Sequence, residues 1–249
     1  MIKAITQRTE ILVNESGLQK LENANIFIAG CGGVGSFVIE AIARAGVGKI
    51  TIVDMDTVDP SNMNRQLVAL HSTIGMPKVE VMHKRIIDIN PKCQVNALQT
   101  FINYENSQEL LTRQKYDYVI DAIDTLNAKV NLVKTAHQLG IKTISSMGAG
   151  GKTDPTQIKI ADIYDTSVCA LARAMRTRLK KQKVKKGIKA VFSTQKSIPP
   201  LPPQNTNHNQ QGRARATNGT ISYMPALFGL TIAGVVIKEI VGKDFKQQK

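Results

Sequence analysis

A glycine-rich turn between an apolar strand and a helix places the strongest constraint on how this chain can fold. In "IFIAGCGGVGS" (26–36), four apolar residues lead into Gly30, Gly32 and Gly35, which match the pattern G-x-G-x-x-G. The first glycine permits a tight turn, the second lets the backbone approach a phosphate, and the third packs the helix on the strand. The stretch predicts a strand–turn–helix unit that binds a nucleotide phosphate. It does not decide between NAD and ATP.

Predicted strands and helices alternate along residues 26–145, as a parallel sheet requires. Apolar spacing and breaker residues indicate further strands over 49–54, 93–98, 116–121 and 141–145. The same signals indicate helices over 34–45, 77–90, 106–114 and 126–138, and an amphipathic segment over 9–22. Strands that alternate with helices build a doubly wound, mostly parallel sheet, so we expect an α/β, Rossmann-like fold.

Beyond residue 151 the alternation changes. We expect a strand over 157–162, a basic helix over 168–182, a strand over 188–193 and a mobile loop over 197–219. The apolar stretch 224–237 is shorter than the roughly 20 residues of a membrane-spanning helix, so a buried helix is favoured over membrane-surface contact. We therefore expect a single domain over 1–249, with a core (1–165) and a basic α+β extension (166–249).

The net charge of +14 lies almost entirely in this extension. Residues 1–165 hold 17 Lys or Arg and 17 Asp or Glu, whereas residues 166–238 hold 13 Lys or Arg and no acidic residue. A carboxylate-free stretch of this length favours a nucleic acid as partner, although a solvated helix face has the same composition. The residues expected to contact phosphates share one predicted helix: Arg173, Arg176, Arg178, Lys180 and Lys181.

Three scattered cysteines limit the chemistry of the chain. Cys31, Cys93 and Cys169 form no C-x-x-C pair, which argues against a zinc knuckle and against a disulfide framework. A reducing, cytosolic setting is the expectation.

Polar residues after the second predicted strand favour ATP over NAD. Asp54 ends that strand, where a carboxylate would bind ribose hydroxyls. "SNMNRQL" (61–67) comes next, and Lys78 stands at the start of the following helix. Arg65 and Lys78 would neutralise the charge that develops when an α-phosphate is attacked. A dehydrogenase would instead need an apolar nicotinamide pocket here.

A pair of carboxylates closes the fourth predicted strand. In "DAIDT" (121–125), Asp121 and Asp124 lie three residues apart. Carboxylate oxygens suit Mg²⁺, so we expect Asp124 to hold the metal that accompanies ATP. Taken singly, Arg65 could form a surface ion pair, Lys78 could be solvated, and Asp124 could cap a helix. Their order on one βαβ framework favours a shared site.

Several motifs together resemble one family of enzymes. The series GCGGVGS, DMD, NMNRQ, Lys78 and DAID resembles the ubiquitin-activating-enzyme-like superfamily of ThiF-like adenylyltransferases, which includes the thiamine and molybdopterin sulfur-carrier activators. Within it, "RTEILVNESGL", "DINPKC", "ISSMGAGGKTDPTQIKIADI", "TRLKK" and "KAVFS" look like the tRNA threonylcarbamoyladenosine dehydratase family. The resemblance covers about residues 8–240 and fails mainly over 197–219. It also departs at Val168 and Cys169, where the family carries Asp-Pro, which leaves the start of the basic helix open.

The resemblance implies a role for each matching residue. The implied ATP site consists of Gly30, Gly32, Gly33, Gly35, Asp54, Asp56, Asn62, Arg65, Gln66, Lys78, Asp121 and Asp124. Within this set, Arg65, Lys78 and Asp124 are the implied catalytic residues. Arg8 falls near an arginine that reaches into the partner subunit's site in related activators, which implies a homodimer.

The resemblance also implies a reaction, with ATP and Mg²⁺ as cofactors and tRNA as partner. Such enzymes activate a carboxylate as an acyl-adenylate and release pyrophosphate. In threonylcarbamoyladenosine, a carbamoyl nitrogen of the same nucleoside can then close a ring, so no enzyme cysteine is needed. A sulfur-relay or helper protein stays open.

Three other functions stay open as well. An adenylyltransferase for a ubiquitin-like sulfur carrier would respond to a protein ending in Gly-Gly, although the paired zinc cysteines of many such enzymes are missing here. A non-catalytic RNA adaptor would bind ATP without releasing AMP. An NAD oxidoreductase would show competition between NAD and ATP.

Overall fold

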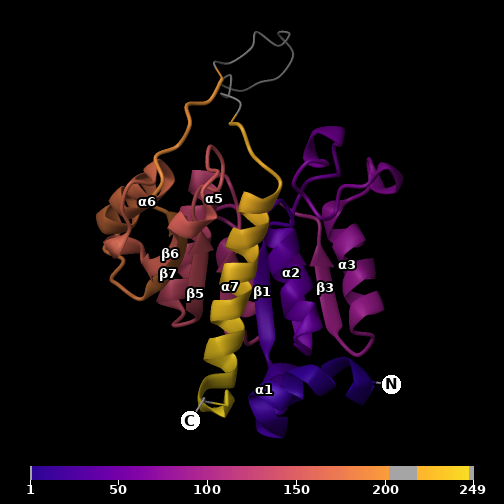
Figure 1. The fold of residues 1–249 in the computed structure, drawn as a ribbon. Helices are drawn as coiled ribbons and strands as arrows, with labels where there is room; N and C mark the ends of the chain where they lie inside the picture. Colours follow the sequence, from indigo (N-terminus) through magenta and orange to yellow (C-terminus); the bar gives the residue numbers. More distant parts are fainter. Residues whose placement is uncertain (1, 202–217, 247–249) are drawn as a thin grey trace.

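The strands of this protein form one sheet of seven in the computed structural model, which describes residues 2–201 and 218–246 (Figure 1). The spatial order is β3-β2-β1-β4-β5-β7-β6, and β6 alone runs antiparallel to its neighbour. The strand bounds are β1 Asn25–Ala29, β2 Lys49–Val53, β3 Gln94–Leu98, β4 Tyr118–Asp121, β5 Lys142–Ser146, β6 Ile158–Asp162 and β7 Ile188–Ser193. The predicted doubly wound, mostly parallel α/β sheet is confirmed.

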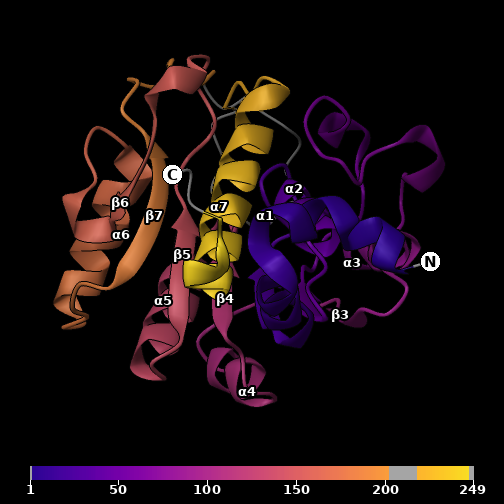
Figure 2. The ribbon, with the colours of Figure 1, turned by 60° about the horizontal axis from the view of Figure 1, so that its bottom comes forward.

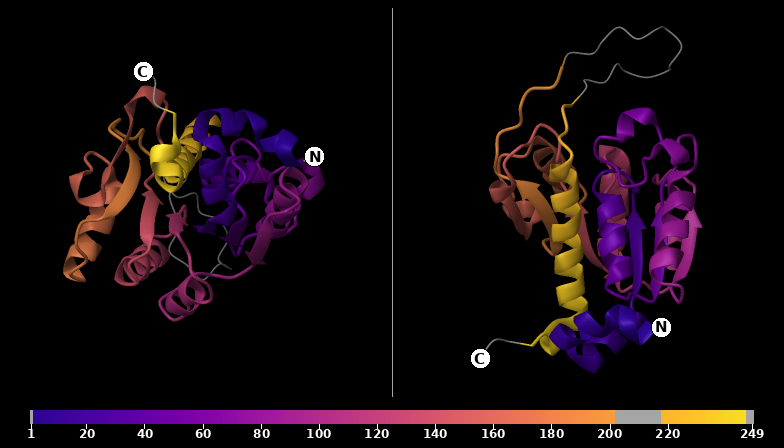
Figure 3. Two further views of the ribbon diagram at one scale, coloured as in Figure 1. Left: turned by 90° about the horizontal axis from the view of Figure 1, so that it is seen from below. Right: turned by 45° about the vertical axis from the view of Figure 1, so that its right-hand side comes forward.

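The helices cover both faces of the sheet (Figures 2 and 3). Their bounds are α1 Ile2–Asn23, α2 Gly35–Arg44, α3 Lys78–Ile89, α4 Ser107–Thr112, α5 Leu126–Gln138, α6 Ala170–Lys181 and α7 Tyr223–Val241. Each helix predicted over 34–193 is present, with ends that differ from the prediction by at most two residues. The amino-terminal helix begins earlier than the predicted 9–22, and it bends at Asn14, where φ is 61°.

Alternate residues of the central strand face two different cores. Ile26 and Ile28 of β1 pack with α2, α3 and α7, whereas Phe27 and Ala29 pack with α4 and α5. This alternation follows from the two-residue repeat of a strand. A strand apolar on both faces must be covered on both, which places β1 at the centre of a three-layer domain.

The chain beyond residue 165 builds part of the same sheet. β7 lies between β5 and β6, and its Val191 packs with the α7 side while Ile188, Ala190 and Phe192 pack with α6. Residues 202–217, most of the predicted loop 197–219, lie outside the described residues. The division at residue 165 therefore follows charge, while the sheet runs through both parts.

The apolar carboxy-terminal helix packs on the body of the protein. Within the described residues, Tyr223–Asp244 is the only helical stretch long and apolar enough to cross a membrane, with a mean hydropathy of 1.8. It packs against α1, α2, β5 and β7, and 44% of its most apolar window is buried. One face of α7 therefore belongs to the protein core. The helix is longer than the apolar stretch 224–237 on which the argument from sequence rested.

A glycine lets α7 approach α2 closely. A Cβ atom at Gly229 would lie 2.5 Å from the carbonyl oxygen of Val34 and 3.0 Å from the Cβ of Phe37. We expect Gly229→Ala to lower the free energy of unfolding by about 1–3 kcal/mol, because the helices must separate. Gly234→Ala on the same helix is the matched control, since its Cβ would meet nothing within 4 Å. Denaturant unfolding of the two variants measures the difference, and equal stabilities would contradict the close-packing argument.

The direction in which successive strands are added to the sheet reverses beside β1: β2 and β3 follow on one side, and β4 and β5 follow on the other. β1 pairs with β2 on one side and with β4 on the other, so the loops after β1 and β4 diverge from one point of the sheet. Doubly wound sheets bind ligands outside the carboxyl ends of their strands at such a switch point.

Candidate active site

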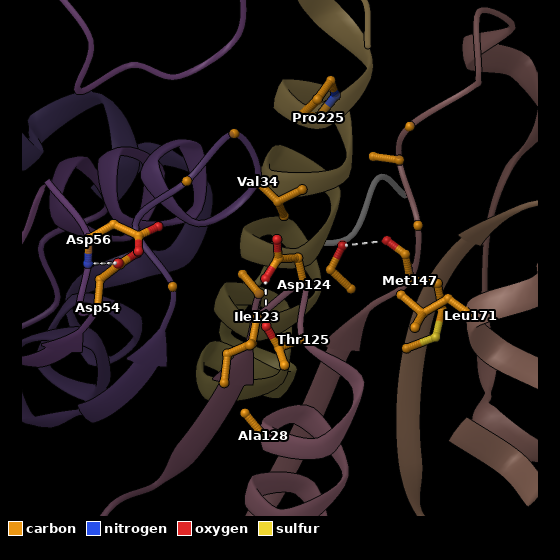
Figure 4. A pocket seen from close by; sticks show the side chains of 18 of the residues that line it. Val34, Asp54, Asp56, Ile123, Asp124, Thr125, Ala128, Met147, Leu171 and Pro225 are labelled. Carbon is orange, nitrogen blue, oxygen red and sulfur yellow. Dashed lines mark hydrogen bonds between the residues drawn. The ribbon is translucent and has the colours of Figure 1, made fainter. Parts of the chain in front are cut away.

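A pocket of about 750 Å³ opens at the carboxyl ends of β1, β2, β4 and β5. In Figure 4, Asp54 and Asp56 stand on one wall, Met147 and Leu171 stand on the opposite wall, and Asp124 lies between them. The volume falls within the roughly 300–1,000 Å³ of small-molecule sites. The predicted ATP-site residues that line it are Gly30, Gly32, Gly33, Asp54, Asp56, Arg65, Gln66, Lys78 and Asp124.

The glycine loop has the geometry expected of a phosphate loop. Gly30 has a φ of 96°, a conformation that favours glycine, and a Cβ there would lie 2.7 Å from the carbonyl oxygen of Ala122. A Cβ at Gly35 would overlap the carbonyl of Gly30, so Gly35 serves the packing beneath the pocket. The amino end of α2 has no side-chain cap, and the N–H of Ser36 donates to the carbonyl of Gly32, so the N–H groups that can meet an anion are those of the glycine loop ahead of Ser36.

Asp54 ties the glycine loop to the end of β2. Its Oδ2 accepts a hydrogen bond from the N–H of Cys31 at 2.6 Å, and its Oδ1 accepts one from the N–H of Asp56 at 2.8 Å. Burial raises the pKa of the Asp54 carboxyl above its ordinary 3.8, and the two N–H groups oppose that rise. A carboxylate offers about four acceptor positions, so Asp54 can still accept hydrogen bonds from ribose hydroxyls.

Asn62 shapes the turn that carries Arg65. It ends the short 3₁₀ helix Pro60–Asn62, whose reciprocal capping pairs Asn62 with Asp59. The carbonyl oxygen of Asn62 accepts the N–H groups of Arg65 and Gln66. Asn62 itself is buried and lies behind the pocket wall, so the structure gives this predicted ATP-site residue a supporting position.

Two cations line the same pocket as the glycine loop. The Nη1 of Arg65 donates to the carbonyl of Ser61 at 2.9 Å and to Oδ1 of Asn64 at 2.8 Å. Lys78 is 5% exposed, and its Nζ lies 2.9 Å from Oδ2 of Asp56. A lysine in the first turn of a helix opposes the helix dipole, so its place in α3 suits an anionic ligand better than it suits the helix.

The two carboxylates after β4 separate in the structure. Asp124 is exposed at the pocket, and its Oδ1 accepts from Oγ1 of Thr125 at 3.1 Å. Thr125 is the N-cap of α5 and no side chain caps that end, so Asp124 does not act as a cap. Asp121 is fully buried and pairs with Lys129 at 2.7 Å, behind the pocket wall.

The opposite wall was not predicted from the sequence. It consists of Ser146–Gly150 after β5, Cys169–Leu171 at the start of α6, and the described residues Ser197 and Asn218. Thr220 and Pro225 also line the pocket, but Thr220 lies beside both Gly150 and Asn64, and Pro225 packs against Gly33 of the glycine loop. α6 begins at Ala170, directly after Val168 with φ of 60° and the N-cap Cys169. One available signal is "MGAGG" (147–151), which follows β5 as the first glycine loop follows β1.

The cysteines sit in different surroundings. Burial, and next the charge of Asp54, raise the pKa of the Cys31 thiol well above its ordinary value. Burial raises the pKa of Cys93 to about 12. Both thiols therefore stay protonated and unreactive. Cys169 lines the pocket.

The five predicted phosphate-contacting cations of α6 differ in their exposure and in their hydrogen-bond partners. Arg173, Lys180 and Lys181 are exposed along one stripe, on the side away from the buried residues of the helix. Arg176 donates to the carbonyl and hydroxyl of Thr166, and Arg178 donates to Oδ1 of Asn127. Arg178 is exposed as well, but its guanidinium is held by Asn127, so Arg173, Lys180 and Lys181 have the freest side chains of the predicted set.

Comparison with known proteins places the chain among enzymes of tRNA modification. It is 41% identical over 246 residues to tRNA threonylcarbamoyladenosine dehydratase of Bacillus subtilis, covering 96% of this chain and 95% of that protein. It is 36% identical over 253 residues to the Escherichia coli dehydratase, covering 96% and 94%.

Solved structures agree with these relatives. The crystal structure of the Escherichia coli dehydratase in complex with ATP matches with a TM-score of 0.86 at 35% identity, covering 97% of this chain and 95% of that one. The same enzyme in complex with AMP matches equally well. The ThiF family model matches residues 6–249. The chain belongs to the ThiF family, and the relatives above, matched over nearly their whole length, are tRNA threonylcarbamoyladenosine dehydratases.

Proposed function

We propose that this protein dehydrates threonylcarbamoyladenosine in tRNA, with ATP as the activating reagent. The observation that carries the proposal is the set of two cations, Arg65 and Lys78, beside a glycine loop in one pocket. Two cations at a phosphate loop suit a polyphosphate. Relatives that match over nearly the whole chain carry the dehydratase name, and one is solved with ATP and with AMP.

The reaction balances without an external nucleophile. A carboxylate oxygen of the threonyl group attacks the α-phosphorus of ATP, and pyrophosphate leaves. The carbamoyl nitrogen then attacks the activated carbonyl carbon, loses its proton, and displaces AMP. The oxygen lost from the carboxylate leaves in AMP, so ring closure amounts to the loss of one water.

The residues of the pocket suit the first step. Arg65 and Lys78 neutralise the charge that develops around the phosphates. Lys78 gives up its contact with the exposed Asp56 when phosphate oxygens replace that carboxylate. Asp54 accepts from ribose hydroxyls, and the glycine loop offers its N–H groups to the phosphates.

Asp124 fits a magnesium ion that enters with the nucleotide. Among residues 2–201 and 218–246, no three His, Cys, Asp or Glu side chains come together as a metal site. Mg²⁺ is commonly held by one or two carboxylates together with phosphate oxygens and water, so a single exposed carboxylate beside the phosphates fits. The ion would supply further neutralisation of phosphate charge.

The proposed assembly is a cytoplasmic homodimer. The helix α1 lies at the end of the sheet opposite the pocket (Figure 1). Its residue Arg8 is exposed and does not line the pocket of its own chain. In a dimer it would face the partner's pocket. Sedimentation analysis tests this, and a monomer at micromolar concentration would contradict it.

A sulfur-carrier activator is the alternative function. The sulfur carrier protein adenylyltransferase of Thermus thermophilus is 34% identical, but over only 128 residues, which is 51% of this chain. Full-length matches to the dehydratases favour the tRNA reaction. Pyrophosphate exchange that responds to a Gly-Gly-ended protein and not to tRNA would favour the alternative.

Nucleoside mass spectrometry tests the proposed function directly. tRNA carrying threonylcarbamoyladenosine is incubated with ATP, Mg²⁺ and the protein, digested, and compared with a sample without ATP. We expect the nucleoside to lose the mass of one water as AMP appears. ATP binding without AMP release would instead support an RNA adaptor.

We expect no cysteine to be essential, because the substrate carries its own nucleophile. Cys93→Ala and Cys169→Ala should retain most of the dehydration rate, and Cys31→Ala should lose some stability, since that side chain is fully buried. Single-turnover assays of each variant measure the rate. A Cys169→Ala protein that folds and binds ATP but forms no product would overturn the mechanism.

A further inference from the structure

A fully buried ammonium group lies behind the pocket. The Nζ of Lys129, on α5, donates to Oδ2 of Asp121 at 2.7 Å, to Oγ of Ser145 at 3.2 Å and to the carbonyl of Ser146 at 2.8 Å. Lys129, Asp121 and Ser145 each have a relative exposure of 0%. A lysine has three N–H donors, so all three are used and the direction of the ammonium is fixed.

The partners of Lys129 end the two strands that lead into the Asp124 segment and into the segment 147–150 of the pocket lining. Asp121 ends β4, and its Oδ1 accepts the N–H of Ile123 at 3.1 Å, in the segment that leads to Asp124. Ser145 and Ser146 end β5, directly before the segment 147–150 of the opposite wall. Ser145 also donates to Oδ2 of Asp121 at 2.5 Å, which closes the network between the strands.

Stability alone gives no reason to keep this pair. Charges buried this deeply lose their hydration, and apolar residues of similar volume often replace such pairs at no cost. What apolar residues cannot reproduce is the directional link from Lys129 to a carboxylate on one strand and a carbonyl on the next. The network therefore has a geometric role that packing does not supply.

We propose that Lys129 is a positioning residue that sets the spacing between the Asp124 segment and the segment 147–150. The inference rests on the proposed function in one respect: in the proposed reaction the α-phosphorus of ATP lies beside Asp124, and the attacking carboxylate lies beside the segment 147–150. The distance between the two reactants then depends on the spacing of these two segments. A misplacement of about 1 Å can lower a rate by roughly a hundredfold.

The test compares Asp121→Asn/Lys129→Met with Lys134→Met, a variant of a neighbouring lysine on the same helix. The double variant leaves no buried charge unpaired, and its amide can still accept from Ile123, so we expect it to fold with a melting temperature near that of the wild type. We expect kcat for AMP release to fall by about tenfold to a hundredfold. The KM for ATP should change less than kcat, and the Lys134→Met protein should behave as the wild type.

Hydrogen exchange supplies a readout that needs no substrate. We expect faster amide exchange over both 122–125 and 147–150 in the double variant than in the control. A double variant with wild-type kcat and unchanged exchange would overturn the proposal. A melting temperature so low that unfolding of the double variant explains its lower kcat would overturn it as well. If the wild-type protein forms no dehydrated nucleoside, the proposed function fails, and the exchange result alone decides the role of Lys129.

Discussion

Arg65→Ala and Lys78→Ala will each reduce tRNA-dependent AMP release by roughly a hundredfold to a thousandfold, the loss seen when one preorganised charge-stabilising donor is removed. The effect should appear in kcat, because each cation meets the greatest negative charge as pyrophosphate departs. Lys78→Ala leaves Asp56 behind, but the side chain of Asp56 is 57% exposed, so no buried charge is stranded. We therefore expect both variants to fold.

The control for this prediction is Lys84→Ala, which removes an exposed lysine from the same helix as Lys78. Its AMP release should match the wild type. Thermal unfolding of all three variants separates a loss of catalysis from a loss of structure. Wild-type AMP release by a folded Arg65→Ala or Lys78→Ala protein would remove that residue from the catalytic set.

The local architecture was predictable because its signals are short-range. The glycine loop, the apolar strand before it and the 3.6-residue spacing over 77–90 each lie within a few residues, and all three elements are present. The position of β7 between β5 and β6, and the antiparallel direction of β6, were not predicted. They depend on pairing between strands separated by a helix and loops, which local patterns do not encode.

The candidate site, like the fold, was predictable from the sequence only in part. Asp121 and Asp124 were both assigned to the site from the sequence, yet Asp121, which ends β4 as predicted, faces Lys129, whereas Asp124 reaches the pocket. The partners that hold Asp121 away from the pocket, Lys129 and Ser145, come from α5 and β5, and the pattern around 121–125 does not encode those contacts. The wall at 146–150 was missed because glycine, serine and methionine carry no side-chain signature of catalysis.

Reversing the exposed charges of α6 should weaken tRNA binding strongly and leave ATP affinity unchanged. The variant Arg173→Glu/Lys180→Glu/Lys181→Glu places three carboxylates on the exposed stripe of the helix. These three cations are chosen because Arg176 and Arg178 already donate to neighbouring groups and help to hold the helix in place. The residues lie outside the lining of the ATP pocket, so nucleotide binding should not respond.

Salt dependence separates direct binding of phosphates from a general effect of charge. For each phosphate that the helix no longer neutralises, the slope of log affinity against log salt should fall by roughly 0.7–0.9, so three phosphates account for about 2–3 of the slope. The matched control is Lys84→Glu/Lys92→Glu/Lys115→Glu, which reverses the same number of exposed charges within residues 1–165. It lowers the net charge equally, so it should weaken long-range attraction of tRNA. Its slope of log affinity against log salt should stay closer to that of the wild type than the slope of the α6 variant does. If the two triple variants lose affinity and slope alike, the tRNA responds to overall charge, and α6 is a solvated helix face.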